Sequence, residues 1–297
     1  MNMPTRNIFL IAAVTLAASC SLGGPTHDET ISRTFPAAGV HRLDLREVNG
    51  SVDISAGPAD SITLVAHVHA RGQQPDARKD NKGYFETNLD GETLVVGRRN
   101  ERRHVGFPFV FSTHNVSVDY DIHVPPQFDL ELRTVNGRIA TRGVDGETDA
   151  VTVNGAIDVE SSGMRELRAH TVNGGLKARF MQTFQGANLK TVNGGVVAVL
   201  PPNASFACDL SQVNGDFEAS FPLNIHSHPG SRRVSGEVNG GRYDLRIVTV
   251  NGDIRVENGA GTMAVPLPPA PPAGSTAMPA TPAPPAPPAP PHGSWGT

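Results

Sequence analysis

The stretch "LKTVNGGVVAVL", residues 189–200, contains the tripeptide Val-Asn-Gly, and this tripeptide decides the fold. It occurs eight times in the 297-residue chain. The eight units begin at Val48, Val135, Val153, Val172, Val192, Val213, Val238 and Val250. From the second unit to the sixth, successive valines are 18, 19, 20 and 21 residues apart. A near-constant period of about 20 residues predicts a repeat architecture, in which each repeat packs mainly on its neighbours.

Apolar residues recur at two positions around each valine, three residues before it and four residues after it. In the quoted stretch these residues are Leu189 and Val196. Seven of the eight units keep both positions apolar, and the exception is the unit at Val238, which has Ser235 and Arg242 there. Alternation of apolar and polar residues, as in "SVDIS" and "NVSVDYDIHV", is typical of β-strands. The sequence therefore predicts an all-β body in which each unit is a strand, a corner and a second strand.

Two architectures fit two strands in every repeat. In an up-and-down β meander, Asn-Gly would form a type I′ hairpin turn, but Asp-Gly or Gly-Gly would serve almost as well there. The corner here is Val-Asn-Gly in every unit. In a β-solenoid the coils lie ~4.8 Å apart, so stacked Asn amides can form a hydrogen-bonded ladder. We therefore predict a right-handed, single-stranded β-helix with coils of about 20 residues, and keep the meander as the alternative.

The corner residues of this β-solenoid are expected to stack from coil to coil. They are Asn49, Asn136, Asn154, Asn173, Asn193, Asn214, Asn239 and Asn251. The residue before the valine is Thr in five units, for example Thr191, and we expect this polar side chain to face solvent. If stacking follows the order of the chain, Asn214 lies next to Asn193.

The N-terminus, "MNMPTRNIFLIAAVTLAASC", has the pattern of a secretory signal. Arg6 precedes a short apolar run, which is followed by small residues. The run is too short to cross a bilayer, which takes about 20 residues. "LAASC" resembles the bacterial lipobox, so Cys20 is the expected lipidation site, and Ser21 implies sorting to the outer membrane. An ordinary signal peptide with an incidental Cys20 is the alternative.

Composition divides the chain into five parts. We predict a lipoprotein signal peptide, a tether, an N-terminal β region with the first coil, the Val-Asn-Gly β-solenoid, and a disordered tail rich in Pro and Ala. These parts span residues 1–19, 20–29, 30–125, 126–260 and 261–297, respectively. Besides Cys20 the only cysteine is Cys208, which alternates with apolar residues and is expected to be a buried free thiol.

No cluster of side chains predicts a cofactor or a metal ion. Two histidine pairs, His67 with His69 and His226 with His228, each lie on one face of an expected strand. Structural or catalytic zinc needs three or four protein ligands, so we interpret these histidines as exposed polar residues.

Charged side chains on the coils are expected to pair across strands rather than to form a catalytic site. Asp158 and Glu160 occupy outward positions in one coil, and Lys177 and Arg179 occupy the equivalent positions in the next. Opposite charges at such positions indicate surface pairing. No catalytic residues are predicted.

A basic segment, "GRRNERRH" at residues 97–104, precedes the aromatic segment "VGFPFVF". A solvated hairpin loop is the simplest interpretation. The alternative is a contact surface for anionic lipid head groups or an acidic glycan. The arginines of this candidate contact surface are Arg98, Arg99, Arg102 and Arg103.

The passage "VDYDIHVPPQFDLELRTVNGRIATRGVDGETDAVTVNGAIDVES" resembles a bacterial β-strand-repeat family of unknown function known as "putative adhesin". The resemblance rests on a strand ending in Val124 and Pro125, followed by units such as residues 130–137 with Ile139. It extends over residues 40–258. The resemblance implies a β-solenoid in the cell envelope, and it carries over no catalytic residues.

These observations together predict a lipoprotein of the cell envelope with a non-catalytic structural, adhesive or binding role. The expected partners are the membrane, through the lipid anchor, and an envelope glycan or protein. The net charge of −4 argues against a nucleic-acid partner. Two alternatives stay open: a carbohydrate-active enzyme on a β-helix scaffold, and a component of envelope-stress signalling.

Overall fold

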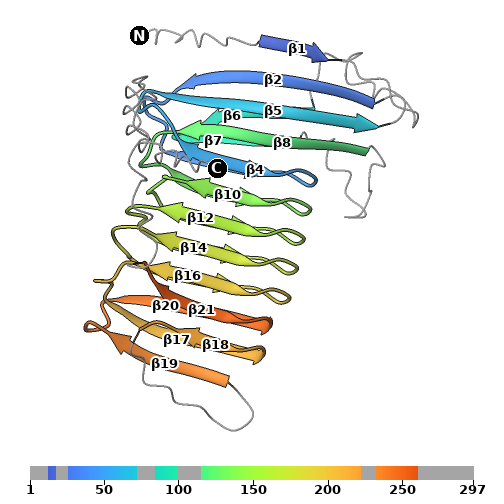
Figure 1. The fold of residues 1–297 in the computed structure, drawn as a ribbon. Helices are drawn as coiled ribbons and strands as arrows, with labels where there is room; N and C mark the ends of the chain where they lie inside the picture. The colour runs from blue at the N-terminus through green and yellow to red at the C-terminus, as the bar shows by residue number, and fades with distance from the viewer. Residues whose placement is uncertain (1–12, 18–25, 72–83, 99–114, 222–231, 260–297) are drawn as a thin grey trace, which may run out of the picture. The chain divides into compact units, whose positions relative to one another are not determined.

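The structure, a computed structural model, describes residues 13–17, 26–71, 84–98, 115–221 and 232–259. These residues form mostly β-strands, arranged in one sheet of 11 strands and one of 10 (Figure 1). We call them sheet A and sheet B. Within the described residues, no helix has the length and apolar character needed to cross a membrane. The expected all-β class is confirmed.

Sheet A contains the strands that follow the Val-Asn-Gly corners, together with long antiparallel strands at one end. Its order in space is β1 (Ala13–Ala17), β2 (Thr26–Pro36), β5 (Ser61–Arg71), β8 (Asn115–Val124), β4 (Val52–Ala56), β10 (Ile139–Arg142), β12 (Ile157–Ser161), β14 (Leu176–Phe180), β16 (Val196–Leu200), β21 (Ile254–Asn258) and β18 (Phe217–Ala219).

Sheet B contains the strands that precede the corners. Its order in space is β19 (Arg232–Val238), β17 (Phe206–Asn214), β20 (Tyr243–Asn251), β15 (Ala187–Lys190), β13 (Leu167–His170), β11 (Thr148–Val151), β9 (Asp129–Arg133), β3 (Arg42–Arg46), β7 (Thr93–Arg98) and β6 (Phe85–Asp90).

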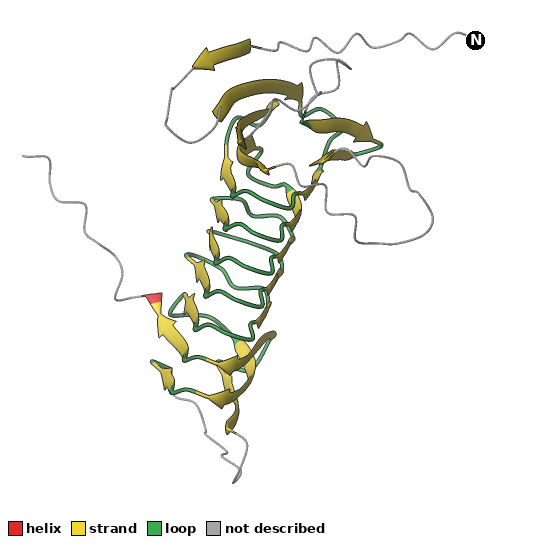
Figure 2. Ribbon diagram, turned by 90° about the vertical axis from the view of Figure 1, so that its right-hand side faces the viewer, coloured by secondary structure: helices red, strands yellow, loops and turns green. Residues whose placement is uncertain are grey.

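The chain passes from sheet B through a Val-Asn-Gly corner to sheet A and then returns to sheet B one coil further along (Figure 2). Equivalent residues of successive coils pair in parallel register, as Ile139 does with Ile157, and Ile157 with Leu176. A meander would instead pair successive strands antiparallel. The parallel register confirms a β-solenoid-like stack and contradicts the meander. The right-handed winding stays a prediction.

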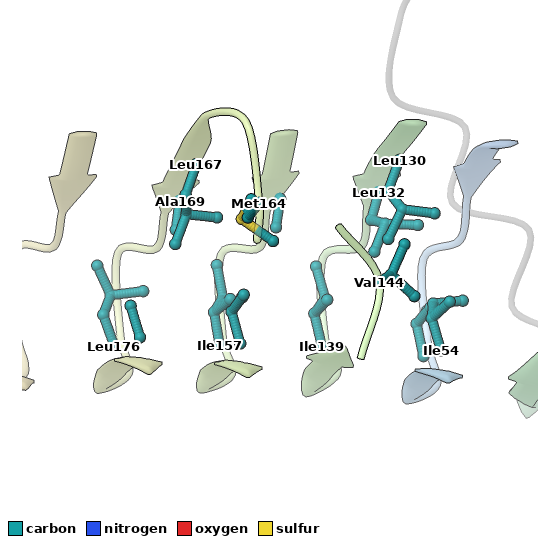
Figure 3. Packing of buried hydrophobic residues seen from close by; sticks show 14 of the residues in the cluster. Ile54, Leu130, Leu132, Ile139, Val144, Ile157, Met164, Leu167, Ala169 and Leu176 are labelled. Atoms are coloured by element: carbon teal, nitrogen blue, oxygen red, sulfur yellow. The ribbon is translucent and has the colours of Figure 1, made fainter. Parts of the chain in front are cut away.

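The core lies between the two sheets and consists of the two expected apolar columns. In the column before the corner, Leu132 and Leu189 are completely buried, and in the column after it, Ile139 and Val196 are as well. Figure 3 shows Leu132 and Ile139 pointing into the space between the two sheets. Phe217, in the last coil of the stack, is only partly buried. The side of the stack opposite the Val-Asn-Gly corners adds further buried residues that the alternation did not predict: Val144, Met164, Phe184 and Ala204.

The corner asparagines form the expected amide ladder. From Asn136 onward, each Nδ2 donates a hydrogen bond of 2.8–2.9 Å to the Oδ1 of the preceding asparagine in the ladder. In space the ladder runs through Asn49, Asn136, Asn154, Asn173, Asn193, Asn251 and Asn214. In such a chain of amides, the Nδ2 of each internal asparagine donates one hydrogen bond and its Oδ1 accepts another, so both groups have a partner within the ladder.

The corner glycines are required by the closeness of successive coils. A Cβ built on Gly155 would lie less than 3.0 Å from the carbonyl oxygen of Gly137, and one on Gly174 would lie equally close to that of Gly155. Neither glycine has a positive φ, so their backbone conformation does not demand glycine. The constraint is the space between coils, where only a residue without a side chain fits.

The corner threonines point inward, so the expectation that they face solvent is wrong. Thr191 is buried, with an exposed fraction of 3%. Its Oγ1 donates a 2.9 Å hydrogen bond to the carbonyl oxygen of Gly174 in the preceding coil. Thr152 and Thr171 make the same bond to Gly137 and Gly155. The threonine hydroxyl thus supplies a hydrogen-bond donor to a part-buried backbone carbonyl of the neighbouring coil.

The order of coils in space departs from the order of the chain. Strands β20 and β21 lie between the coil of β15 and β16 and the coil of β17 and β18. Asn251 therefore separates Asn193 from Asn214, and the expected contact between Asn193 and Asn214 is wrong. The chain reaches this position by reversing at β19, which pairs antiparallel with β17.

Asn239 lies outside the ladder, so its expected place as a stacked corner is also wrong. It has a positive φ of 49° in the turn between β19 and β20, and its Nδ2 donates to the carbonyl oxygen of Ala204 at 2.9 Å. This unit is the one with Ser235 and Arg242 at the column positions, and both are exposed. Without apolar residues at these two positions, the unit cannot continue the two inward columns of the stack.

Double substitutions in the ladder test the spatial order of the coils. We expect Asn193→Asp and Asn251→Asp to be coupled unfavourably by about 1 kcal/mol in a double-mutant cycle, because two carboxylates would stack ~4.8 Å apart. Asn193 and Asn214 belong to successive repeats of the chain, but Asn251 lies between them in space. The pair Asn193→Asp and Asn214→Asp should therefore show almost no coupling. Urea unfolding of the single and double variants at low salt measures both values. Stronger coupling between positions 193 and 214 would contradict the order of the coils.

Two neighbouring glycines test the space between coils. We expect Gly174→Ala to reduce the free energy of unfolding by about 2 kcal/mol or more, since the new methyl group must displace backbone. In Gly175→Ala the Cβ would lie 3.5 Å from the nearest carbonyl oxygen, that of Gly195. This matched variant should change stability by no more than about 1 kcal/mol. Equal effects of the two substitutions in urea unfolding would refute the steric explanation.

Candidate ligand-binding surface

Outward side chains of sheet B form networks of charge that cross from coil to coil. Arg133 Nη2 lies 2.9 Å from Glu131 and 3.1 Å from Asp149 in the next coil. The hydrogen bond to Glu131, followed by the neighbouring carboxylates, raises the pKa of Arg133. The charge of Glu166 raises the pKa of Arg168 in the same way. These exposed pairs order the surface more than they stabilise the fold.

The outward face of sheet A shows the predicted cross-strand pairing. Arg138 Nη2 lies 2.6 Å from Asp158, and Arg179 Nη1 lies 3.6 Å from Glu160. Pairing of the two acids with basic neighbours is confirmed, although Arg138 of the preceding coil, rather than Lys177, holds Asp158. A shallow depression of about 200 Å³ lies over these residues.

A larger hollow of about 600 Å³ lies on the outward face of sheet B, where β20 is inserted between β15 and β17. Its lining includes Asn188, Tyr243, Asp244 and Arg246. The hollow was not predicted from the sequence, because the coils were expected to stack in the order of the chain. The irregular unit at Val238 is the signal that could have shown where the regular stacking stops.

Exposed valines run beside the asparagine ladder and were also not predicted as a surface. Val135 and Val153 are each 38% exposed, and Val213 is 66% exposed. Because they occupy equivalent positions in different coils, they place apolar groups along the edge where the two sheets meet.

The predicted anchor and the Arg-rich contact surface lie outside the described residues. The backbone of Arg98 ends β7, but its side chain, together with Arg99, Arg102, Arg103 and Cys20, is not among them. The segment that contains these arginines joins β7 of sheet B to β8 of sheet A. Both assignments stay predictions.

The histidines of β5 are exposed, as expected. His67 Nδ1 lies 3.2 Å from the hydroxyl of Thr30, and His69 Nδ1 lies 2.9 Å from Asp28. His69 Nε2 is 3.6 Å from Asp119. In the part of the chain that the structure describes, no group of three or more His, Cys, Asp or Glu side chains is arranged to hold a metal ion. The pair at residues 226 and 228 lies outside that part.

Cys208 is a free thiol with an exposed fraction of 5%, which confirms the expected buried position. Burial raises the pKa of the Cys208 thiol, because the charged thiolate loses solvation. A thiol in this environment is a poor nucleophile.

The solved structures to which this chain is similar include three from bacteria. The first is a "putative cell adhesion protein" from Clostridium sporogenes, with a TM-score of 0.44 and 10% identity, over 84% of this chain and 99% of that chain. The second is a "putative adhesin" from Bacteroides fragilis, with a TM-score of 0.36 and 12% identity, over 76% and 96% of the respective chains. The third is a "putative lipid binding protein" from Parabacteroides distasonis, with a TM-score of 0.27 and 8% identity, over 76% and 96%. These scores are too low to transfer a function.

A search of curated proteins gives no match. Residues 113–257 match the family model described as "Toastrack DUF4097", and this match confirms the resemblance to the β-strand-repeat "putative adhesin" family.

Proposed function

We propose that the protein is a lipoprotein of the cell envelope with a non-catalytic binding role, in which the outward faces of the β-solenoid form the binding surface. The proposal includes the right-handed, single-stranded winding expected from the sequence. It also includes attachment to the outer membrane through a lipid on Cys20, for which the lipobox-like "LAASC" is the support.

The single observation that carries this proposal is the in-register stacking of the coils. Parallel pairing places equivalent outward residues, such as Asp149 and Arg168, side by side in neighbouring coils. Because the coils lie ~4.8 Å apart, a long ligand lying across them can contact the equivalent position of several successive coils. The amide ladder and the corner glycines fix this spacing, so the surface is preorganised for such a ligand.

The charged side chains on sheet A also favour binding over catalysis. A glycoside hydrolase on this scaffold would need a pair of carboxyl groups available to the scissile bond. Asp158 and Glu160, the pair considered in the sequence, are each within 4 Å of an arginine, Arg138 and Arg179 respectively. We infer that these groups contribute to surface recognition.

The anchor is tested by membrane fractionation in a bacterium with an outer membrane. We expect Cys20→Ser to move the protein from the membrane fraction to the soluble fraction, because the lipid would supply the binding energy. Cys208→Ala, which changes the other cysteine, is the matched control and should stay in the membrane fraction. A Cys20→Ser variant that still fractionates with membranes would overturn the anchor.

The binding role is tested with the soluble full chain carrying Cys20→Ser and isolated cell envelopes. We expect saturable binding that unlabelled protein displaces and that salt weakens, since the surface is charged. The same chain carrying Gly174→Ala, if it is unfolded, should lose this binding. Binding that does not saturate, or that the unfolded variant retains, would count against the proposed function.

A further inference from the structure

The hollow on sheet B exists because β20 interrupts the regular stack. In register, Asp244 of β20 lies beside Ala207 of β17, and Gly186 precedes β15 on the other side. Neither small residue has an outward side chain long enough to cover Asp244. The result is the open space of about 600 Å³, within the range of about 300–1,000 Å³ typical of small-ligand sites.

The floor of the hollow is held in place by aromatic packing. Phe184 contacts the rings of Phe180, Phe206 and Tyr243 edge to face, with centroids 5.0, 6.0 and 6.5 Å apart. Tyr243 is only partly buried and also lines the hollow. Tyr243 alternates with Asp244 along β20, so its ring lies on the inner face with Leu245 and packs beneath the strand.

Two of the carboxylates at the hollow already have cationic partners. Asp209 accepts two hydrogen bonds of 2.9 Å from Arg233 on β19. Glu166 accepts one of 2.9 Å from Arg168. Arg246 lies in register with Asp209, but Arg233 occupies both oxygens of that carboxylate.

Three charged groups at the hollow remain without an ion pair among the described residues: Arg242, Asp244 and Arg246. The guanidinium of Arg242 lies 5.3 Å from the centroid of the Tyr243 ring. These three groups have a net charge of +1, which favours a ligand that carries an anionic group. Arginine is suited to carboxylate and phosphate because it can donate two parallel hydrogen bonds.

The amide of Asn188 supplies a second, independent feature. Its Oδ1 is buried and has no hydrogen-bond donor in the described part of the chain. Asn188 lies in register with Arg246, and both line the hollow. A buried acceptor without a donor is costly, and a ligand hydroxyl would satisfy it.

We propose that this hollow binds a saccharide that carries an anionic group. A sugar hydroxyl donates to Asn188 Oδ1, and further hydroxyls donate to Asp244. The carboxylate or phosphate of the sugar accepts hydrogen bonds from Arg246 and Arg242. This inference rests on the proposed binding role and names the ligand class and one site for it.

The test is isothermal titration of the full chain carrying Cys20→Ser with trigalacturonate, its methyl ester, and galactose 6-phosphate. We expect trigalacturonate to bind at least tenfold more tightly than its uncharged ester, because only the acid can pair with Arg246. Binding of galactose 6-phosphate alone would support the same site with phosphate as the anionic group. Equal binding of acid and ester, or no binding of either anionic sugar at millimolar concentration, would overturn the proposal.

Two arginines of the same coil provide matched variants. Arg246→Gln, on the outward face of sheet B, should weaken binding of the anionic sugar at least tenfold. Arg255→Gln, on β21 of sheet A and paired with Glu218 at 3.2 Å, should leave it unchanged. Both variants are first checked by circular dichroism and urea unfolding, and Arg242→Gln takes the place of Arg246→Gln if the latter does not fold. Unchanged affinity in the folded hollow variant would refute the site.

The envelope-binding assay separates failure of this site from failure of the proposed function. If the Arg246→Gln variant binds envelopes normally, and trigalacturonate does not displace the unsubstituted chain from envelopes, the saccharide site in the hollow is wrong and the binding role stands. If the unsubstituted chain shows no saturable envelope binding, the proposed function itself fails.

Discussion

The close approach of glycine backbones at the corners is the constraint on which the rest of the stack depends. Each corner glycine leaves so little space to the next coil that a methyl group would overlap a carbonyl oxygen. That approach allows Thr171 to reach the carbonyl of Gly155, and Asn173 to reach the amide of Asn154. In the seven stacked units, the close approach of the coils accounts for the glycine and the amide ladder accounts for the asparagine, and both reasons involve a neighbouring part of the stack rather than one isolated turn.

The repeat period and the alternation of apolar residues were sufficient to predict the class of fold and the two inward columns of its core. The inward columns, for example Leu189 and Val196, are local properties, because a residue's neighbours along the strand decide its face. The threonine was assigned to the wrong face because polarity was taken to mean solvent. The hydroxyl of Thr191 donates a hydrogen bond to the carbonyl oxygen of Gly174 inside the stack. This partner can be identified only when two coils are placed together.

The order of the coils and the hollow could not be predicted in the same way. Both depend on β20 entering between β15 and β17, and this pairing is decided by contacts between segments far apart in sequence. Ser235 and Arg242 marked the unit that does not form a coil, but they did not show where the chain goes next. Asn188 shows why. No motif in the sequence around it marks a binding site, and its Oδ1 lacks a hydrogen-bond donor only because of the way the neighbouring strands pack around it.

The insertion of β20 and β21 has a consequence for how the molecule folds. In a simple solenoid, each new coil adds to the exposed end of those already formed, so the stack can grow in the direction of synthesis. Here β17 has no direct pairing with β15, and both strands pair with β20 instead. The coil of β17 and β18 therefore cannot dock until residues 243–258 have been synthesised. The final segments close the stack together, which makes completion of this end a concerted, non-local and comparatively slow step.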